Sequence, residues 1–243
     1  MISDFAAGAR YFTQGLRLIN LPGIRRYAAI PVLIALVVLG VLVTLGATYF
    51  DSLLDWLLPP SDSWWSGLVR TVLWPLFAMA SLLVLYFGFT VLANLFGAAF
   101  NGLLSEKVEA RLRGQGIDTG GLGTALRDLV PATFNELRKL LYFVFWVVPL
   151  LLLFLVPGLQ IIAAVLWAVF SAWMLAVEYG AYPMDNHRIR FPQARAALGQ
   201  RRMLAQGFGA AVMVAMLIPV FNVLVMPAAV AGATAMYVDH FGE

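Results

Sequence analysis

The chain has 243 residues, of which 62% are hydrophobic and only 12% are charged, with a formal net charge of +3. A soluble protein carries about twice that share of charged residues, so the composition excludes a soluble globular protein and indicates an integral membrane protein. The chain contains no cysteine, which excludes a disulfide framework, a thiolate nucleophile and a cysteine-based metal site.

The first half of the chain predicts two long membrane-spanning helices. Residues 28–50 contain no charged residue, and a helix of this length crosses a bilayer core of roughly 30 Å at about 1.5 Å per residue. Residues 72–104 form a longer apolar block, which predicts a tilted helix that continues beyond the membrane surface. Between them, residues 51–68 contain aspartates and tryptophans but no lysine or arginine, which is typical of a short loop at a membrane interface.

The second half predicts a polar segment followed by two helical hairpins. Residues 105–139 are polar and contain a glycine-rich loop over 114–123. Residues 140–177 and 203–238 each hold two apolar arms that meet at an uncharged proline turn, and the small residues at 228–235 predict close helix packing. Because the arms are at the short limit of a span, we expect each hairpin to cross the bilayer fully or only partway. The predicted fold class is an all-α integral membrane protein that forms one membrane domain.

Positive charge is distributed unevenly along the chain. Fifteen of the 16 lysines and arginines lie in residues 1–27, 105–139 and 178–202, and the other is Arg70. Under the positive-inside rule these three segments are cytoplasmic. We therefore expect a multi-pass protein with both termini in the cytoplasm and with residues 51–68 on the opposite side.

An arginine pair, Arg25 and Arg26, stands directly before the first apolar block. Pro22 suits the first position of a helix, which would leave the N–H groups of Gly23, Ile24 and Arg25 free. A helix start with free donors and two guanidinium groups has the components of a site for sulfate or phosphate. The alternative from the residues alone is that the arginines are topology anchors that touch lipid phosphates.

A second group of polar residues follows at the cytoplasmic end of the long block. It consists of Asn101, Glu106, Lys107, Glu109 and Arg111. An asparagine in lipid is costly, so the Asn101 amide should face protein or water, and Glu109 is spaced to pair with Arg113 one helical turn later. We interpret the group as a candidate pore or gate, with a solvated helix face as the alternative.

Other chemistry has little support in the sequence. Asp185 and His187 are close together, but the only other histidine is His240, so we expect no metal site. The chain lacks a phosphate-binding loop for ATP, a catalytic triad and a basic nucleic-acid surface. We therefore expect neither an enzyme nor a cofactor. Glu178, at the end of an apolar arm, is either a buried pairing partner or a surface cap.

Several segments carry a resemblance to a known family. They are GLRLINLPGIRRYAAIP (15–31), FNGLLSEKVEARL (100–112), NELRKLLYF (135–143), EYGAYPMDNH (178–187), QGFG (206–209) and IPVFNVLVMPAAVAGAT (218–234). Over nearly its whole length the chain resembles the CysZ sulfate permease family of bacterial inner membranes. In that family a Gly-Leu-Arg-Arg stretch at the start of the first long helix binds sulfate. The resemblance implies the same role for Gly23, Ile24, Arg25 and Arg26, with isoleucine in place of leucine.

The residues alone lead to an anion-handling membrane protein. The resemblance adds sulfate uptake across the inner membrane for assimilatory cysteine synthesis, and a homo-oligomer. The expected partners are sulfate, membrane lipid and further copies of the chain. The alternative hypothesis is a non-transporting membrane scaffold in which the arginines only orient the chain.

Overall fold

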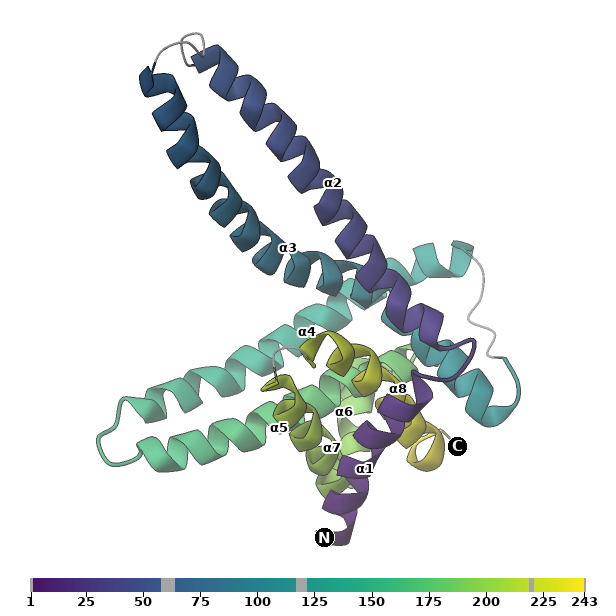
Figure 1. Cartoon of the computed structure of the whole chain (residues 1–243). Coiled ribbons are helices and arrows are strands. Elements are labelled where there is room, and N and C mark those ends of the chain that lie inside the picture. Colours follow the sequence, from purple (N-terminus) through teal and green to yellow (C-terminus); the bar gives the residue numbers. More distant parts are fainter. Residues whose placement is uncertain (1, 58–63, 117–121, 219–220, 243) are drawn as a thin grey trace. The chain divides into compact units, whose positions relative to one another are not determined.

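A computed structural model describes residues 2–57, 64–116, 122–218 and 221–242 of the chain. These residues form α-helices joined by turns, and no β-strand occurs among them (Figure 1). The predicted all-α class is therefore confirmed. Pro219, the expected tip of the second hairpin, lies outside the described residues.

The chain divides into two compact units, one formed by residues 1–28 and 101–243 and the other by residues 29–100. Two long helices supply the second unit. α2 spans Arg25–Leu57 and α3 spans Trp64–Arg113, so each helix also contributes residues to the first unit.

The prediction of a loop over 51–68 was wrong at both ends, because α2 ends only at Leu57 and α3 begins at Trp64. Arg70 of α3 forms an ion pair with Asp55 of α2. Nearby, Phe50 stacks on Phe77 with ring centroids 4.4 Å apart. These contacts link the two helices, so polar residues at the helix ends gain partners and the helices continue through them.

The first hairpin consists of α4 and α5, which span Leu122–Phe154 and Gln160–Asn186. They meet at a turn in which Gly158 adopts a φ of +86°, a conformation that glycine reaches without a steric penalty. Both helices extend well beyond the arms expected from residues 140–177. In each helix the apolar part continues directly into polar helical turns. Hydropathy detects the apolar part but does not show that the polar turns belong to the same helix.

The remaining helices are shorter. α1 spans Ile2–Leu18, α6 spans Phe191–Gln200, α7 spans Arg202–Met216 and α8 spans Asn222–His240. Within the first unit, α1 packs on both α7 and α8, and α5 packs on the same two helices (Figure 1). α8 is the centre of this unit, because nearly every residue from 225 to 237 is buried.

Glycines allow α1 to approach its neighbours closely. A Cβ atom placed on Gly15 would overlap the carbonyl oxygen of Ala228, and one on Gly232 would overlap that of Tyr11. Between α1 and α7, a Cβ atom on Gly8 would likewise overlap the carbonyl oxygen of Leu204, and one on Gly207 would overlap that of Phe5. The close packing predicted from the small residues at 228–235 is therefore confirmed.

Four helical segments among the described residues are long and apolar enough to cross a membrane. They are Arg25–Trp56, Gly67–Leu85, Phe134–Phe154 and Gln160–Asn186. Most of their residues are not buried within the protein, which suits a lipid environment. The protein is therefore a membrane protein. α7 has 15 residues. At about 1.5 Å per residue it is too short to cross a bilayer core of roughly 30 Å.

Candidate functional site

A turn over residues 19–24 joins α1 to α2 and places the arginine pair. Gly23 in this turn has a φ of +89°. A residue with positive φ does not fit within a right-handed helix, so α2 begins only at Arg25. The predicted helix start at Pro22 was therefore wrong.

The backbone donors of the turn also differ from the expectation. The N–H groups of Ile24 and Arg25 both donate to the carbonyl oxygen of Leu21, each with an N···O distance of 3.1 Å. Within the described ranges, the N–H groups of Gly23 and Arg26 have no hydrogen-bond acceptor. The free donors beside the arginine pair are therefore those of Gly23 and Arg26, not those of three consecutive residues.

The side chains of the turn point in two directions. Ile24 is only 4% exposed and its side chain packs into the core. Arg25 and Arg26 are exposed at the surface. The Arg26 guanidinium donates from Nη2 to the Tyr27 hydroxyl at 3.2 Å and lies 5.0 Å from the centroid of that ring. No carboxylate among the described residues forms an ion pair with either arginine.

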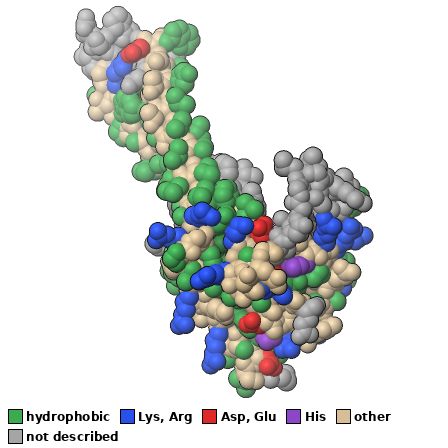
Figure 2. Space-filling view, turned by 90° about the vertical axis from the view of Figure 1, so that its right-hand side faces the viewer, with side chains coloured by type: hydrophobic (Ala, Val, Ile, Leu, Met, Phe, Trp, Pro, Cys, Tyr) green, Lys and Arg blue, Asp and Glu red, His purple; other side chains and the backbone are tan. Residues whose placement is uncertain are grey.

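The end of α3 brings a third cation to this region. Lys107 Nζ donates to Glu106 Oε1 at 3.0 Å, and this hydrogen bond raises the pKa of Lys107 above its ordinary value. The nearby positive charge of Arg26 acts in the opposite direction and is a smaller influence on the pKa of Lys107. Figure 2 shows lysine and arginine side chains gathered over the surface of the first unit.

The five candidate gate residues divide between two faces of α3. Asn101 is 4% exposed and donates from Nδ2 to the Tyr182 hydroxyl at 3.3 Å, so its amide faces protein as expected. Glu109 lies on the same buried face, two helical turns later. Glu106 and Lys107 are half-buried, and Arg111 is exposed with no ion pair to any residue that the structure describes.

Glu109 is the centre of a polar cluster, here called the Glu109 cluster, with Arg113, His187 and Tyr237. Its side chain is fully buried, and its Oε1 atom lies 2.7 Å from Arg113 Nε and 2.8 Å from His187 Nε2. The His187 ring stacks on Tyr237 with centroids 5.2 Å apart. In the part of the chain that the structure describes, Glu109 Oε2 has no hydrogen-bond partner.

Only one of the two contacts of Glu109 could be predicted from the sequence. Its pairing with Arg113, expected from the spacing of four, is confirmed. The sequence reasoning missed His187 as a partner because it lies 78 residues away, and no local spacing links the two. Glu178 forms an ion pair with Lys139 at 2.8 Å and is 43% exposed, so it is a pairing partner near the surface.

We expect Glu109→Gln to lower the free energy of unfolding by about 1–3 kcal/mol, because the amide leaves Arg113 and His187 without their carboxylate. Thermal unfolding in detergent measures this change. Glu136→Gln is the matched control, since the Glu136 side chain is 63% exposed and should tolerate the change. Equal stability of the two variants would contradict a structural role for the Glu109 cluster.

The described side chains do not form a metal site. Among the described residues, no group of three or more histidine, aspartate and glutamate side chains is arranged to hold a metal ion. His187 is instead engaged by Glu109 and Tyr237.

Comparison with known proteins places these features in a family. The family model described as "Sulfate transporter CysZ/Etoposide-induced protein 2.4" matches residues 11–227. A sulfate transporter CysZ of Pseudomonas paraeruginosa is 41% identical over 98% of this chain and 96% of its own length. One of Salmonella typhimurium is 42% identical over 96% of this chain and 92% of its own length. One of Pectobacterium atrosepticum is 40% identical over 97% and 86%, respectively. The chain therefore belongs to the family of the sulfate transporter CysZ and etoposide-induced protein 2.4.

Proposed function

We propose that the protein transports sulfate across the bacterial inner membrane and so supplies assimilatory cysteine synthesis. The observation that carries the proposal is the exposed arginine pair at the first turn of α2, which lacks a carboxylate partner among the described residues. It stands in a chain whose relatives are named sulfate transporters.

Sulfate suits this position in charge and in geometry. It carries two negative charges at neutral pH, which the guanidinium groups of Arg25 and Arg26 balance. Each guanidinium offers a fork of N–H donors that matches a tetrahedral oxyanion. The free N–H groups of Gly23 and Arg26, at the positive end of the α2 dipole, add two uncharged donors.

The polar end of α3 supports a role in the passage of the anion. Lys107, which pairs with Glu106, and Arg111 lie one helical turn apart on α3 and give this end of the helix two cations. Asn101 and Glu109 lie on the buried face of the same helix. We infer that the five candidate gate residues have different roles. Lys107 and Arg111 contact the anion, whereas Glu109 holds the end of α3 in place.

Uptake of labelled sulfate by liposomes that contain the purified protein tests the function. We expect uptake that saturates with sulfate concentration and exceeds that of empty liposomes. A parallel series with an imposed pH gradient distinguishes channel-like flux from proton coupling. No uptake beyond empty liposomes under either condition would favour the alternative of a non-transporting scaffold, in which the arginines only orient the chain.

Topology gives an independent prediction. By the positive-inside rule, residues 178–202 face the cytoplasm and the end of α2 faces the periplasm. The chain has no cysteine, so single cysteines report their own position. In intact cells an impermeant maleimide should label Ser52→Cys but not Arg190→Cys until the membrane is opened. Labelling of Arg190→Cys from outside would contradict this topology.

We further propose a homo-oligomer. Many apolar side chains of the four candidate spans are exposed. Copies of the chain would cover part of this surface and could line a shared path. Liposomes that each hold a single copy and still take up sulfate would contradict the oligomer.

A further inference from the structure

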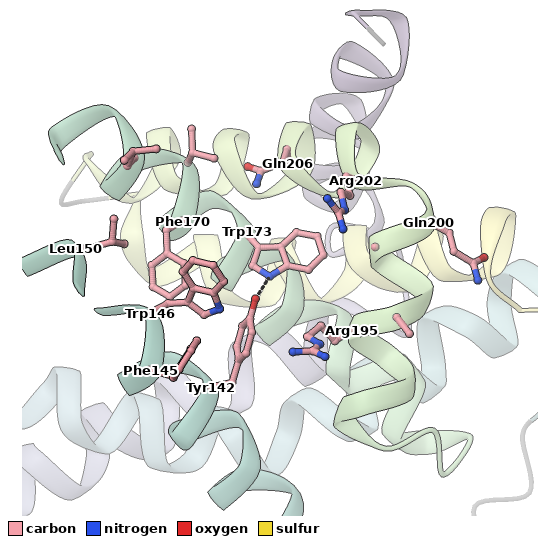
Figure 3. Close-up of a pocket in the computed structure, with 14 residues that line it drawn as sticks. Tyr142, Phe145, Trp146, Leu150, Phe170, Trp173, Arg195, Gln200, Arg202 and Gln206 are labelled. Atoms are coloured by element: carbon pink, nitrogen blue, oxygen red, sulfur yellow. Dashed lines mark hydrogen bonds between the residues drawn. The ribbon is translucent and has the colours of Figure 1, made fainter. Parts of the chain in front are cut away.

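A pocket of about 910 Å³ opens between α4, α5, α6 and α7, within the first unit. It lies apart in sequence from the arginine pair of α2 and shares no residue with the candidate gate. Figure 3 shows Phe145, Trp146, Leu150 and Phe170 toward one side of the pocket and Arg195, Arg202 and Gln200 toward the other, with Gln206 nearer the apolar side.

The apolar part belongs to the two helices of the first hairpin. Phe145, Trp146 and Leu150 line it from α4, and Leu166 and Phe170 line it from α5. All five lie inside segments that are long and apolar enough to cross a membrane. From position 142 to position 150 the α4 side of the pocket runs for about 12 Å along the helix. This part of the pocket therefore runs along two helices that are apolar enough to meet lipid.

The polar part lies where α6 ends and α7 begins. Arg195 and Arg202 line it together with Gln200 and Gln206. No carboxylate among the residues that the structure describes forms an ion pair with either arginine. Both guanidinium groups are therefore available to an anion.

Tyr142 separates the two parts and holds the arginine side in place. The Arg195 guanidinium lies 4.9 Å from the centroid of the Tyr142 ring. The Tyr142 hydroxyl accepts a hydrogen bond from Trp173 Nε1 at 3.1 Å, drawn as the dashed line in Figure 3. A cation stacked on an aromatic face keeps its N–H edges free, so Arg195 can bind an anion without leaving the ring.

We propose that this pocket binds an anionic phospholipid. One acyl chain lies along α4 and α5, and the phosphate contacts Arg195 and Arg202. Basic pockets beside membrane-spanning helices suit lipid phosphates in this way, because the charge sits at the depth of the headgroups and the apolar lining at the depth of the chains.

Two other occupants fit the lining less well. Free sulfate or phosphate would satisfy the arginines but would leave the aromatic and aliphatic side chains of α4 and α5 facing water or nothing. A second copy of the chain would have to bring a carboxylate to two arginines and an apolar wedge to the hairpin at the same place. An anionic phospholipid carries both chemistries in one molecule and is present at high concentration around any membrane protein.

Native mass spectrometry of delipidated protein tests the proposal. The probes are phosphatidylglycerol and phosphatidylcholine with identical acyl chains. We expect wild-type protein to bind phosphatidylglycerol roughly tenfold more tightly than phosphatidylcholine, since charge-assisted hydrogen bonds to two arginines distinguish them. Equal affinity for the two lipids would overturn the proposal without any variant.

Two variants locate the site. Arg195→Gln/Arg202→Gln should remove the preference for phosphatidylglycerol, and Arg195→Lys/Arg202→Lys should retain part of it. The matched control is Arg10→Gln/Arg17→Gln, which removes the same charge from exposed positions of α1. If the control loses the preference equally, the effect is one of net charge and the proposal fails.

Further arms distinguish the other occupants. Val169 of α5 also lines the apolar part. Val169→Trp should fill this part and weaken binding of both lipids, whereas a site for a free anion would not respond to it. Sulfate at millimolar concentration should not displace phosphatidylglycerol from the wild type. Displacement by sulfate would assign the arginines to a free oxyanion. Efficient cross-linking of Gly199→Cys between copies in native membranes, together with no lipid preference, would assign the pocket to a subunit interface.

Discussion

Simultaneous replacement of Arg25 and Arg26 by alanine should weaken sulfate binding by about a hundredfold or more. A single charge-assisted hydrogen bond accounts for roughly a tenfold to hundredfold change in affinity, and the double variant removes both guanidinium groups. Because neither arginine pairs with a carboxylate among the described residues, the loss reflects binding and not a broken ion pair. Calorimetric titration of sulfate into the purified protein measures it.

Two controls separate a binding site from a topology anchor. Arg10→Ala/Arg17→Ala removes the same charge from exposed positions of α1 and should retain wild-type affinity. Lysine at positions 25 and 26 keeps the charge but loses the planar fork, so it should restore only part of the affinity. If the Arg25→Ala/Arg26→Ala protein inserts correctly and binds sulfate as the wild type does, the arginines are anchors and the substrate site lies elsewhere.

The second large effect is expected at the contact between α1 and α8. Gly15→Leu should destabilise the protein by about 3 kcal/mol or more, because the new side chain meets backbone atoms of Ala228 and Gly232 that cannot move aside without separating the helices. α8 is the buried centre of the first unit, so the damage spreads to the helices that pack on it. Thermal unfolding and size-exclusion chromatography in detergent measure the outcome.

Gly40→Leu is the matched control for this variant. Gly40 is also helical, but a Cβ atom there would have no described neighbour within 4 Å. The same substitution should therefore change stability little and should favour the helix. A Gly15→Leu protein that unfolds at the same temperature as the Gly40→Leu protein would show that α1 does not pack closely on α8.

The packing of α1 also distinguishes two similar stretches of the sequence. Gly15, Leu16 and Arg17 repeat the short Gly-Leu-Arg pattern of the family. The structure places Gly15 in the interior of α1, against the backbone of α8. The stretch at Gly23 instead lies in an exposed turn directly before α2. One stretch therefore lies inside a helix and the other in a turn, and the sequence pattern alone does not distinguish these two positions.

The sequence by itself determined the class of the protein and the position of its most charged features. Apolar length sets membrane spans because each buried backbone group must be satisfied within its own helix, so α2 and the apolar part of α3 were predictable. The i to i+4 geometry of a helix made the pairing of Glu109 with Arg113 predictable in the same way. The arginine pair was visible because it stands directly before a long block that contains no charged residue.

Only the tertiary structure decided which side chains meet across the first unit. His187, directly after α5, contacts Glu109 of α3. Ile24 is buried within the turn before α2, and the positive φ of Gly23 in that turn explains why α2 begins only at Arg25. The pocket that joins Tyr142 to Arg195 and Arg202 likewise draws on four helices. Local patterns report the conformation of a segment, because the forces that set it act between near neighbours along the chain. Contacts between distant segments depend on how close the helices come, and here the glycines of α1, α7 and α8 set that distance through backbone contacts whose partners the sequence does not name.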